Sequence, residues 1–291
     1  MNLVEKSICS LDNNGGQCLP SKVINVLSKD IIKPNTCTDD TCKVEKLKDK
    51  MNCSDEICIV MKSKLDNDEK NSLLFKYFKP IASVDPNDWL SNLQVDQIQE
   101  QMCKIYDHYY YSCIHMIDFH MIDHKHIEKD FVNIKDIDFV KELNGDVIST
   151  KEKPLKTYGV IFNTDPHYKA GQHWFAIFKD FRKKGTIDDP YTIEYFNSAG
   201  DPLEPKCREY LKDLADNISM RTKKNCVYVR VTDIEHQKPT TGNCGVYALY
   251  YIYSRINNKS ADYFNKEAFK ITDEMMEDFR KKIFNDEKDY K

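Results

Sequence analysis

The run TTGNCGVYALYYIYSRI, residues 240–256, is apolar and tyrosine-rich after its first few residues. This character predicts a buried helix over residues 245–256, and a buried helix requires a sizeable core around it. A chain of 291 residues is long enough to supply such a core together with an appendage. Cys244 stands at the entrance of the predicted helix, so the same segment raises the question whether this cysteine is core filler or a nucleophile.

Short segments of alternating or continuous apolar character predict strands in the C-terminal two thirds of the chain. The expected strands span residues 112–122, 156–165, 173–181, 191–200 and 225–234. Apolar residues at helical spacing predict further helices over residues 97–105, 205–219 and 271–284. Asp96 is the expected cap of the first, and Thr272 or Asp273 that of the last. Helices and strands are mixed without a regular βαβ alternation, so the predicted class is α+β.

Composition changes near residue 80, which predicts a boundary between two domains. The part before it is rich in cysteine and in short polar clusters, whereas the aromatic-rich segments all come later. Segments 21–32 and 72–79 have apolar spacings typical of short helices. We therefore expect a small helical accessory domain over residues 1–85 and a core domain over residues 86–291.

The eleven cysteines are an odd number, and the N-terminus lacks the basic start and apolar centre of a secretory signal peptide. In a reducing cytosol such a set is expected to remain as free thiols rather than to form a disulfide framework. Two pairs, Cys37 with Cys42 and Cys53 with Cys58, each enclose four residues. That spacing lies at the edge of the range for zinc ligands, so a structural zinc site is the alternative to unbound thiols.

Charge and hydropathy exclude several classes of protein. The formal net charge is −4 and the pI is about 6.1, and lysines are interleaved with acids, so the charge does not predict nucleic acid as a partner. No apolar run approaches the roughly 18 residues of a membrane span. We expect a protein that stays in the compartment where it is made.

Cys244, His173 and Asn197 stand at the ends of three predicted elements and together supply the groups that a cysteine hydrolase needs. The N–H groups and the positive dipole end of a helix start favour a thiolate at Cys244, and hence a lowered pKa. His173 begins the third predicted strand, and Asn197 lies at the end of the fourth, where its amide could orient an imidazole. Taken singly, however, a cysteine is more often core filler, and Asn before Ser is usually a turn former.

Three segments carry a family resemblance: HWFAIF, IEYFNSAGD and HQKPTTGNCGVYALYYI, in that order. They resemble the His, Asp/Asn and Gln…Cys-Gly boxes of the ubiquitin-like-protein-specific (SUMO-deconjugating) and adenovirus-type cysteine proteases, which include polyprotein-processing enzymes of large DNA viruses. The segments CSDEIC, MIDF and ITDE extend the likeness over most of the chain. The resemblance implies a ubiquitin-like-protease core, adenain-like and permuted relative to papain, with a small N-terminal helical arm.

The resemblance also implies a role for each site residue. Cys244 is implied as the nucleophile, His173 as the general base and acid, and Asn197 as the residue that orients His173. Gln237 is implied as the side-chain donor to the oxyanion, which the N–H of Cys244 completes. Gln237 stands seven positions before Cys244, one more than is usual in the family, which leaves three further candidate donors: Thr240, Thr241 and Asn243. Neither a metal nor an organic cofactor is implied.

Trp174 and Trp89 are the only tryptophans in the chain. Each taken alone is more readily explained as a core aromatic. In the deconjugating proteases, however, two corresponding rings close a narrow tunnel over the glycines of the substrate. The match implies that this chain cleaves after Gly-Gly, because such a tunnel excludes larger side chains by steric clash.

The expected function is that of an endopeptidase that cleaves viral polyprotein or structural precursors at Gly-Gly-X sites during virion maturation. The expected locations are the host cytoplasm and the virion, and the sequence is compatible with a monomer. Two other functions remain open: a protease that deconjugates SUMO or another ubiquitin-like protein, and a binding module without catalysis. The two protease functions share their chemistry and differ in substrate, whereas the binding module would have no reactive thiol.

Overall fold

The computed structural model describes residues 7–13, 16–117, 156–166, 168–266 and 270–290. The chain divides into two compact units, one formed by residues 1–84 with 281–291 and the other by residues 85–280. Residues 281–291, expected in the core domain, group instead with the N-terminal unit. None of the helices in the described ranges combines the length and the apolar character needed to cross a membrane.

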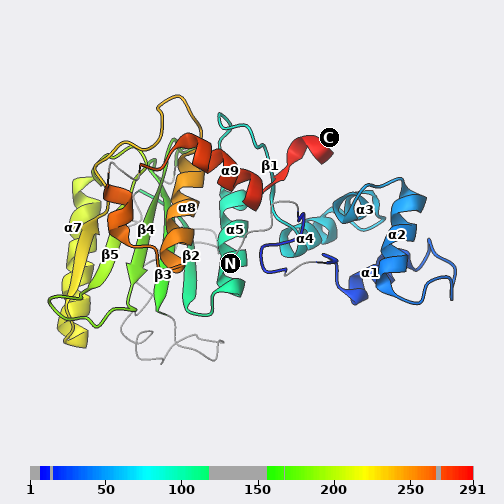
Figure 1. The fold of residues 1–291 in the computed structure, drawn as a ribbon, viewed down its shortest axis with the longest axis horizontal. Helices are drawn as coiled ribbons and strands as arrows, with labels where there is room; N and C mark the ends of the chain where they lie inside the picture. Colours follow the sequence, from blue (N-terminus) through cyan, green and yellow to red (C-terminus); the bar gives the residue numbers. More distant parts are fainter. Residues whose placement is uncertain (1–6, 14–15, 118–155, 167, 267–269, 291) are drawn as a thin grey trace. The chain divides into compact units, whose positions relative to one another are not determined.

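The larger unit is built on a mixed five-stranded sheet with the order β2-β3-β4-β5-β6 (Figure 1). The strands are β2 (Tyr109–Met116), β3 (Thr157–Asn163), β4 (Trp174–Asp180), β5 (Tyr191–Phe196) and β6 (Cys226–Arg230). Strand β4 is antiparallel to β3 and to β5, whereas β2 pairs with β3 and β6 pairs with β5 in parallel. Each strand overlaps a predicted one, which confirms the α+β class; the end of the predicted strand 112–122 lies outside the described residues.

The predicted helices of the larger unit are confirmed with shifted boundaries. They are α5 (Asn92–Ile105), α7 (Pro205–Thr222), α8 (Cys244–Ile256) and α9 (Asp273–Ile283), and a short 3₁₀ helix, η2 (Ala261–Asn265), follows α8. Helix α5 begins earlier than predicted, because Ser91 caps it in a capping box with Gln94. The prediction of Asp96 as the cap is wrong: Asp96 lies within the helix, and its carboxylate accepts a hydrogen bond from the hydroxyl of Tyr111.

Alternate residues of the central strands point to opposite faces of the sheet, and each face is covered by its own helices (Figure 1). Helix α7 covers one face, where its Leu211 belongs to a buried cluster with Ile177 of β4 and Ile193 of β5. Helix α8 packs against β4 on the other face, next to α5. Its Tyr251 stacks on Phe196 of β5 with the ring centroids 4.5 Å apart. The predicted buried helix therefore lies between the sheet and its neighbouring helices.

A buried ion cluster fixes the C-terminal end of α8 to the sheet. Arg255 of α8 donates to both carboxylate oxygens of Glu194 on β5, at 2.7 and 2.8 Å, and to Asp180 at the end of β4, at 3.1 Å. The hydroxyl of Tyr251 donates to Glu194 at 2.6 Å, and Arg182 pairs with Asp180 at 2.6 Å. Each buried charge thus faces an opposite one, which is required because an uncompensated buried charge is strongly destabilising.

Arg255→Met is expected to lower the free energy of unfolding by about 3–5 kcal/mol, because it leaves Glu194 and Asp180 without this cation while it keeps most of the side-chain volume. Chemical denaturation measures this loss. Lys212→Met, at an exposed position of α7, is the matched control and should change the free energy by less than about 0.5 kcal/mol. Similar losses for both variants would contradict the prediction.

The smaller unit is helical. It contains α1 (Ser21–Ser28), α2 (Asp40–Met51), α3 (Glu56–Lys62), α4 (Asn67–Tyr77), the parallel strand pair β1 (Ile81–Ala82) and β7 (Asn285–Asp286), and the 3₁₀ helix η4 (Glu287–Tyr290). Helices α1 and α4 overlap the predicted segments. Helices α2 and α3 were not predicted, and in α2 only Val44 and Leu47 are buried, so the apolar pattern that would reveal it is weak.

Six cysteines form three disulfides in this unit: Cys9–Cys18, Cys37–Cys42 and Cys53–Cys58. The prediction of free thiols is therefore wrong here, and the sulfurs of the two closely spaced pairs bind each other rather than zinc. The reason is a local structure that occurs twice. Asp39 caps α2 by accepting the N–H of Cys42, and Asp55 caps α3 by accepting the N–H of Cys58. This helix entry brings the paired Cα atoms to 5.5 and 5.4 Å, within the range of a disulfide.

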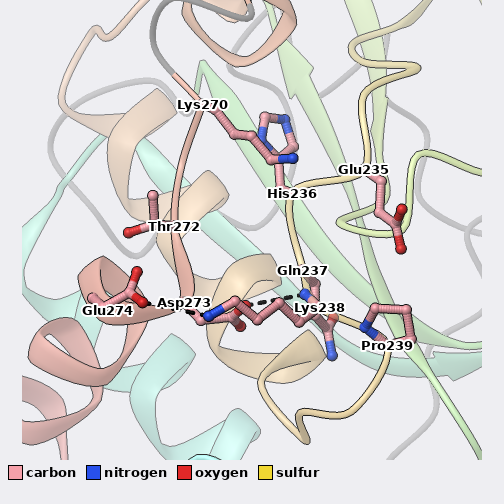
Figure 2. A pocket seen from close by; sticks show the side chains of 9 residues that line it. All are labelled: Glu235, His236, Gln237, Lys238, Pro239, Lys270, Thr272, Asp273 and Glu274. Atoms are coloured by element: carbon pink, nitrogen blue, oxygen red, sulfur yellow. Dashed lines mark hydrogen bonds and ion pairs between the residues drawn. The ribbon is translucent and has the colours of Figure 1, made fainter.

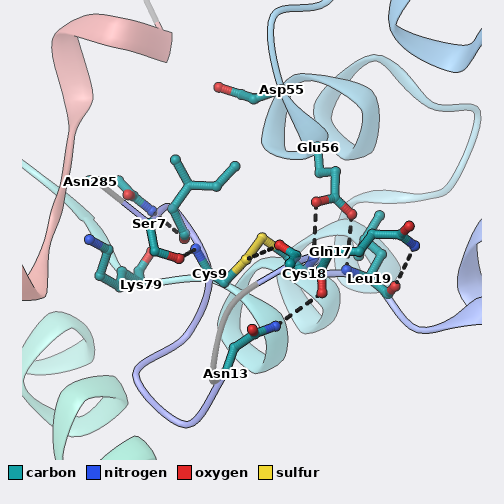
Figure 3. The surroundings of a disulfide bond; sticks show 12 residues. Ser7, Cys9, Asn13, Gln17, Cys18, Leu19, Asp55, Glu56, Lys79 and Asn285 are labelled. Atoms are coloured by element: carbon teal, nitrogen blue, oxygen red, sulfur yellow. Dashed lines mark hydrogen bonds between the residues drawn. A yellow bond between two sulfur atoms is a disulfide. The ribbon is translucent and has the colours of Figure 1, made fainter. Parts of the chain in front are cut away.

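Glu56 lies beside the Cys9–Cys18 disulfide (Figure 3). Its carboxylate accepts the backbone N–H groups of Cys18 and Leu19, each at 3.0 Å. The buried carboxylate therefore satisfies the backbone of the crosslinked segment, and both cysteine sulfurs are used in the disulfide.

Candidate active site

Cys244 is the first residue of α8 and is only 3% exposed. The backbone N–H groups of Trp174 and Gly245 lie close enough to its sulfur to favour the thiolate form. Trp174 is the first residue of β4 and directly follows His173. The start of α8 therefore lies against the start of β4, which brings the thiol to the sheet end that also carries His173.

His173 and Asn197 occupy the same end of the sheet because β4 and β5 are antiparallel: His173 precedes β4, and Asn197 follows β5. Nε2 of His173 lies 2.7 Å from Oδ1 of Asn197. The loop before His173 is closed by Asn163, the last residue of β3, whose Oδ1 accepts the N–H groups of Asp165 and Gln172 at 3.1 and 3.0 Å. The pairing of three neighbouring strands therefore positions the imidazole and the amide.

The amide of Asn197 determines which nitrogen of His173 carries a proton. Oδ1 of Asn197 also accepts the backbone N–H of Ala199 at 3.0 Å, and a backbone N–H can only donate. The amide atom that faces the imidazole is therefore the oxygen, so Nε2 of His173 must carry the proton that it donates. In the neutral ring Nδ1 keeps its lone pair, and it is the nitrogen that can take a proton from a nucleophile.

Burial favours the uncharged forms of both reactive groups. Burial lowers the pKa of His173, while the hydrogen bond to Asn197 and the charge of Asp201 act in the opposite direction. Burial raises the pKa of the Cys244 thiol, while the backbone N–H groups on its sulfur and the charge of Arg280 oppose this rise. The predicted lowering of the Cys244 pKa is therefore wrong, because desolvation outweighs the effect of the helix start. Both pKa directions favour a thiol and a neutral imidazole.

Gln237 is joined to the Asn197 turn through Ser198. The hydroxyl of Ser198 donates to Oε1 of Gln237 at 2.8 Å, and the backbone N–H of Gln237 donates to the carbonyl of Ser198 at 3.1 Å. Nε2 of Gln237 donates to the carbonyl of Thr241 at 2.7 Å. The same amide nitrogen carries a second N–H, which is the group that an oxyanion would use.

Two of the further candidate donors, Thr241 and Asn243, turn toward Asp273 of α9. The hydroxyl of Thr241 lies 3.0 Å from Oδ1 of Asp273, and Nδ2 of Asn243 lies 3.5 Å from the same oxygen. Oδ1 of Asn243 accepts from Arg280 at 3.1 Å, and Thr240 is exposed. Asp273 and Arg280 are not predictable as site residues from the sequence, because they stand 30 and 37 residues from Asn243 and only tertiary structure joins them to it.

Trp89 contacts the chain just before Cys244, and Trp174 contacts it just after. A Cβ added at Gly245 would meet the ring of Trp174 at 3.2 Å, and one added at Gly242 would meet the ring of Trp89 at 2.7 Å. The two glycines thus allow both rings to approach the backbone on either side of the thiol. Trp174 is 5% exposed and Trp89 is 59% exposed.

The sequence model of the C-terminal catalytic domain of the Ulp1 protease family matches residues 87–290. The chain belongs to the Ulp1 protease family. It is a cysteine protease, and the matched residues include the described sheet and the start of α8.

Individual proteins of African swine fever virus are similar over almost the whole chain. A SUMO-1 cysteine protease of this virus is 29% identical over 285 residues, which are 90% of this chain and 99% of the relative. A cysteine protease from another strain has the same identity and coverage. A crystal structure of a protease of this virus superposes with a TM-score of 0.71 at 25% identity and covers 96% of each chain. The resemblance inferred from the sequence is therefore confirmed.

Arg280→Met is expected to raise the pKa of the Cys244 thiol further, because it removes a positive charge that favours the thiolate. The measurement is the rate of iodoacetamide reaction at Cys244 as a function of pH, followed by mass spectrometry. Arg280→Lys keeps the charge and should leave the midpoint of the curve closer to that of the unchanged protein. An unchanged midpoint in the Met variant would show that this charge does not act on the sulfur.

Asn197→Ala is expected to lower kcat/KM by up to about 10²-fold without abolishing it, because the imidazole loses its orienting partner. The hydrogen bond to Asn197 raises the pKa of His173, so its loss lowers this pKa further, and the neutral base persists to lower pH. The acid limb of the kcat/KM profile should therefore move to lower pH. The control, His173→Ala, should remove the activity. An acid limb of the kcat/KM profile that moves to higher pH in the Asn197 variant would contradict this prediction.

Proposed function

We propose that the protein is an endopeptidase that cleaves after Gly-Gly in viral polyprotein or structural precursors, with Cys244, His173 and Asn197 as its catalytic residues. The observation that carries the proposal is the meeting of these groups at one end of the sheet. His173 contacts Asn197 at 2.7 Å, and the ring of Trp174, the residue after His173, lies against Gly245, the residue after Cys244. Nucleophile, base and orienting amide are the groups that thiol proteases require.

The mechanism starts from an uncharged pair, as the pKa directions indicate. Nδ1 of His173 takes the thiol proton as the sulfur of Cys244 attacks the scissile carbonyl carbon. The imidazolium donates Nε2–H to Asn197, which keeps the ring in place, and then protonates the leaving amine. Water, deprotonated by the same imidazole, hydrolyses the thioester and restores the thiol.

The oxyanion of the tetrahedral intermediate needs donors that are in place before the reaction. We assign this role to the backbone N–H of Cys244, at the start of α8, and to the second N–H on Nε2 of Gln237. Gln237 is buried, and both ends of its amide are bonded, to Ser198 and to Thr241. Its direction is therefore set in advance. The other candidates suit the role less well, because Thr241 and Asn243 turn toward Asp273 and Thr240 is exposed.

The selection of glycine rests on Trp174 and Trp89. Both rings pack against glycines of the segment around Cys244, and Trp89 offers most of its surface to a substrate. An extended Gly-Gly backbone needs little room between two flat rings, whereas a side chain would collide with them. The two tryptophans therefore act by steric exclusion.

The kind of substrate is drawn from the similar viral proteases. Because these relatives are proteins of a virus, we propose viral precursors as substrates and the host cytoplasm and the virion as locations. One relative is named a SUMO-1 cysteine protease, so deconjugation of SUMO or another ubiquitin-like protein is the second candidate. Both candidate functions involve cleavage after Gly-Gly. They differ in the substrate protein that contains the Gly-Gly sequence.

Peptides test the cleavage preference directly. A peptide with Gly-Gly before the scissile bond should be cut, and replacing the second glycine with Val should lower kcat/KM on the order of 10²-fold. Trp174→Ala and Trp89→Ala should weaken peptide binding and reduce the difference in kcat/KM between the Gly-Gly and Gly-Val peptides. Cys244→Ala should abolish cleavage. If a peptide with Ala-Val before the bond is cut equally well, selection by the two rings is wrong. Parallel assays with a viral precursor and with SUMO conjugates separate the two candidate substrates.

A further inference from the structure

The segment ITDE, residues 271–274, takes no part in the proposed proton transfers or in the attack on the substrate. Its Asp273 is the first residue of α9 and is 2% exposed, and the hydroxyl of Thr272 accepts the N–H of Met275 in the first turn of that helix. Asp273 is therefore held at a helix start, with its carboxylate buried against the segment that precedes Cys244.

The carboxylate of Asp273 binds both ends of a short turn. Oδ2 accepts the backbone N–H of Lys238 at 3.0 Å, and Oδ1 accepts the hydroxyl of Thr241 at 3.0 Å (Figure 2 shows Lys238 and Asp273). The backbone N–H of Thr241 donates to the carbonyl of Lys238 at 3.1 Å, which closes the turn. Hydrogen bonds to a carboxylate are shorter and stronger than neutral ones, so these contacts restrain the turn firmly.

Gln237 directly precedes this turn and is held by it. Nε2 of Gln237 donates to the carbonyl of Thr241 at 2.7 Å, so the direction of the amide depends on where that carbonyl lies. Thr241 is held in turn by Asp273 at its hydroxyl, and by the carbonyl of Lys238, which accepts its N–H and lies 3.1 Å from the same hydroxyl. A continuous chain of contacts therefore leads from Asp273 through Thr241 to Gln237.

Packing alone leaves this turn room to move. A cavity of about 240 Å³ borders it, lined among others by Gln237, Lys238, Pro239 and Asp273 (Figure 2). This pocket is open on one side, so few protein atoms pack against the turn there. The hydrogen bonds to Asp273 are therefore the restraint that compensates for the missing packing.

We propose that Asp273 is a positioning residue that directs the amide of Gln237 toward the oxyanion. The inference rests on the proposed function, in which Gln237 stabilises the oxyanion. A carboxylate suits this position because both of its oxygens are acceptors, so it can bind the N–H of Lys238 and the hydroxyl of Thr241 at the same time. A displaced oxyanion donor slows the chemical step, because its contact forms only in the transition state.

Asp273→Asn tests this role with little change in volume. The amide replaces one acceptor oxygen with a donor, so it cannot accept from both Lys238 and Thr241. With a fluorogenic peptide amide that ends in Gly-Gly, kcat should fall on the order of 10-fold while KM stays the same. The rate of iodoacetamide reaction at Cys244 should not change, because alkylation forms no oxyanion. Thr241→Val removes one of the same contacts and should reproduce part of the loss in kcat.

Glu274→Gln is the matched control, because Glu274 is the next residue of α9 and pairs on the surface with the side chain of Lys238 at 3.4 Å. It should leave kcat unchanged. In a Gln237→Ala background, Asp273→Asn should cause no further loss, since it acts through Gln237. The inference is overturned by an unchanged kcat in Asp273→Asn, by additive losses in the double variant, or by a parallel fall in the alkylation rate. Cleavage by Cys244→Ala would instead overturn the proposed function.

Discussion

The contact between the start of α8 and the start of β4 is the interaction on which the rest of the site depends. It is made where the ring of Trp174 lies against Gly245, the residue after Cys244. Because His173 directly precedes Trp174, this contact brings the thiol to the sheet end that carries the imidazole. The antiparallel pairing of β4 with β5 then brings Asn197 to the same sheet end. The ion cluster around Arg255 fixes the opposite end of α8, so the helix is held at both of its ends.

The burial that creates this contact also sets the chemistry of the site. Desolvation raises the pKa of Cys244 and lowers that of His173, which favours the uncharged form of each group before substrate arrives. The thiolate is then stabilised as it forms, by backbone N–H groups and by the charge of Arg280. Such a site resists alkylation and oxidation better than a permanent thiolate would, because the thiolate is the reactive form of cysteine.

The two units are stabilised in different ways. The larger unit surrounds α8 with a sheet and further helices, and its described cysteines, Cys103, Cys207, Cys226 and Cys244, form no disulfide. The smaller unit is built of helices, and the three disulfides found in the described part of the chain all lie in it. A small unit buries a smaller fraction of its surface, and crosslinks compensate because they restrict its unfolded chain. In two of the three disulfides the crosslink is built on the same feature, an aspartate that caps the following helix.

The sequence by itself determined the strands, the buried helix and the three residues proposed for catalysis, because each follows from a local pattern at the end of an apolar segment. It also determined the family, through the order of the three boxes around His173, Asn197 and Cys244. Tertiary structure decided the rest. The direction of the Cys244 pKa depends on burial, and the contacts of Asp273 and Arg280 with Asn243 join residues 30 and 37 positions apart. No local pattern encodes such contacts, because they exist only once α9 lies against the segment that precedes Cys244.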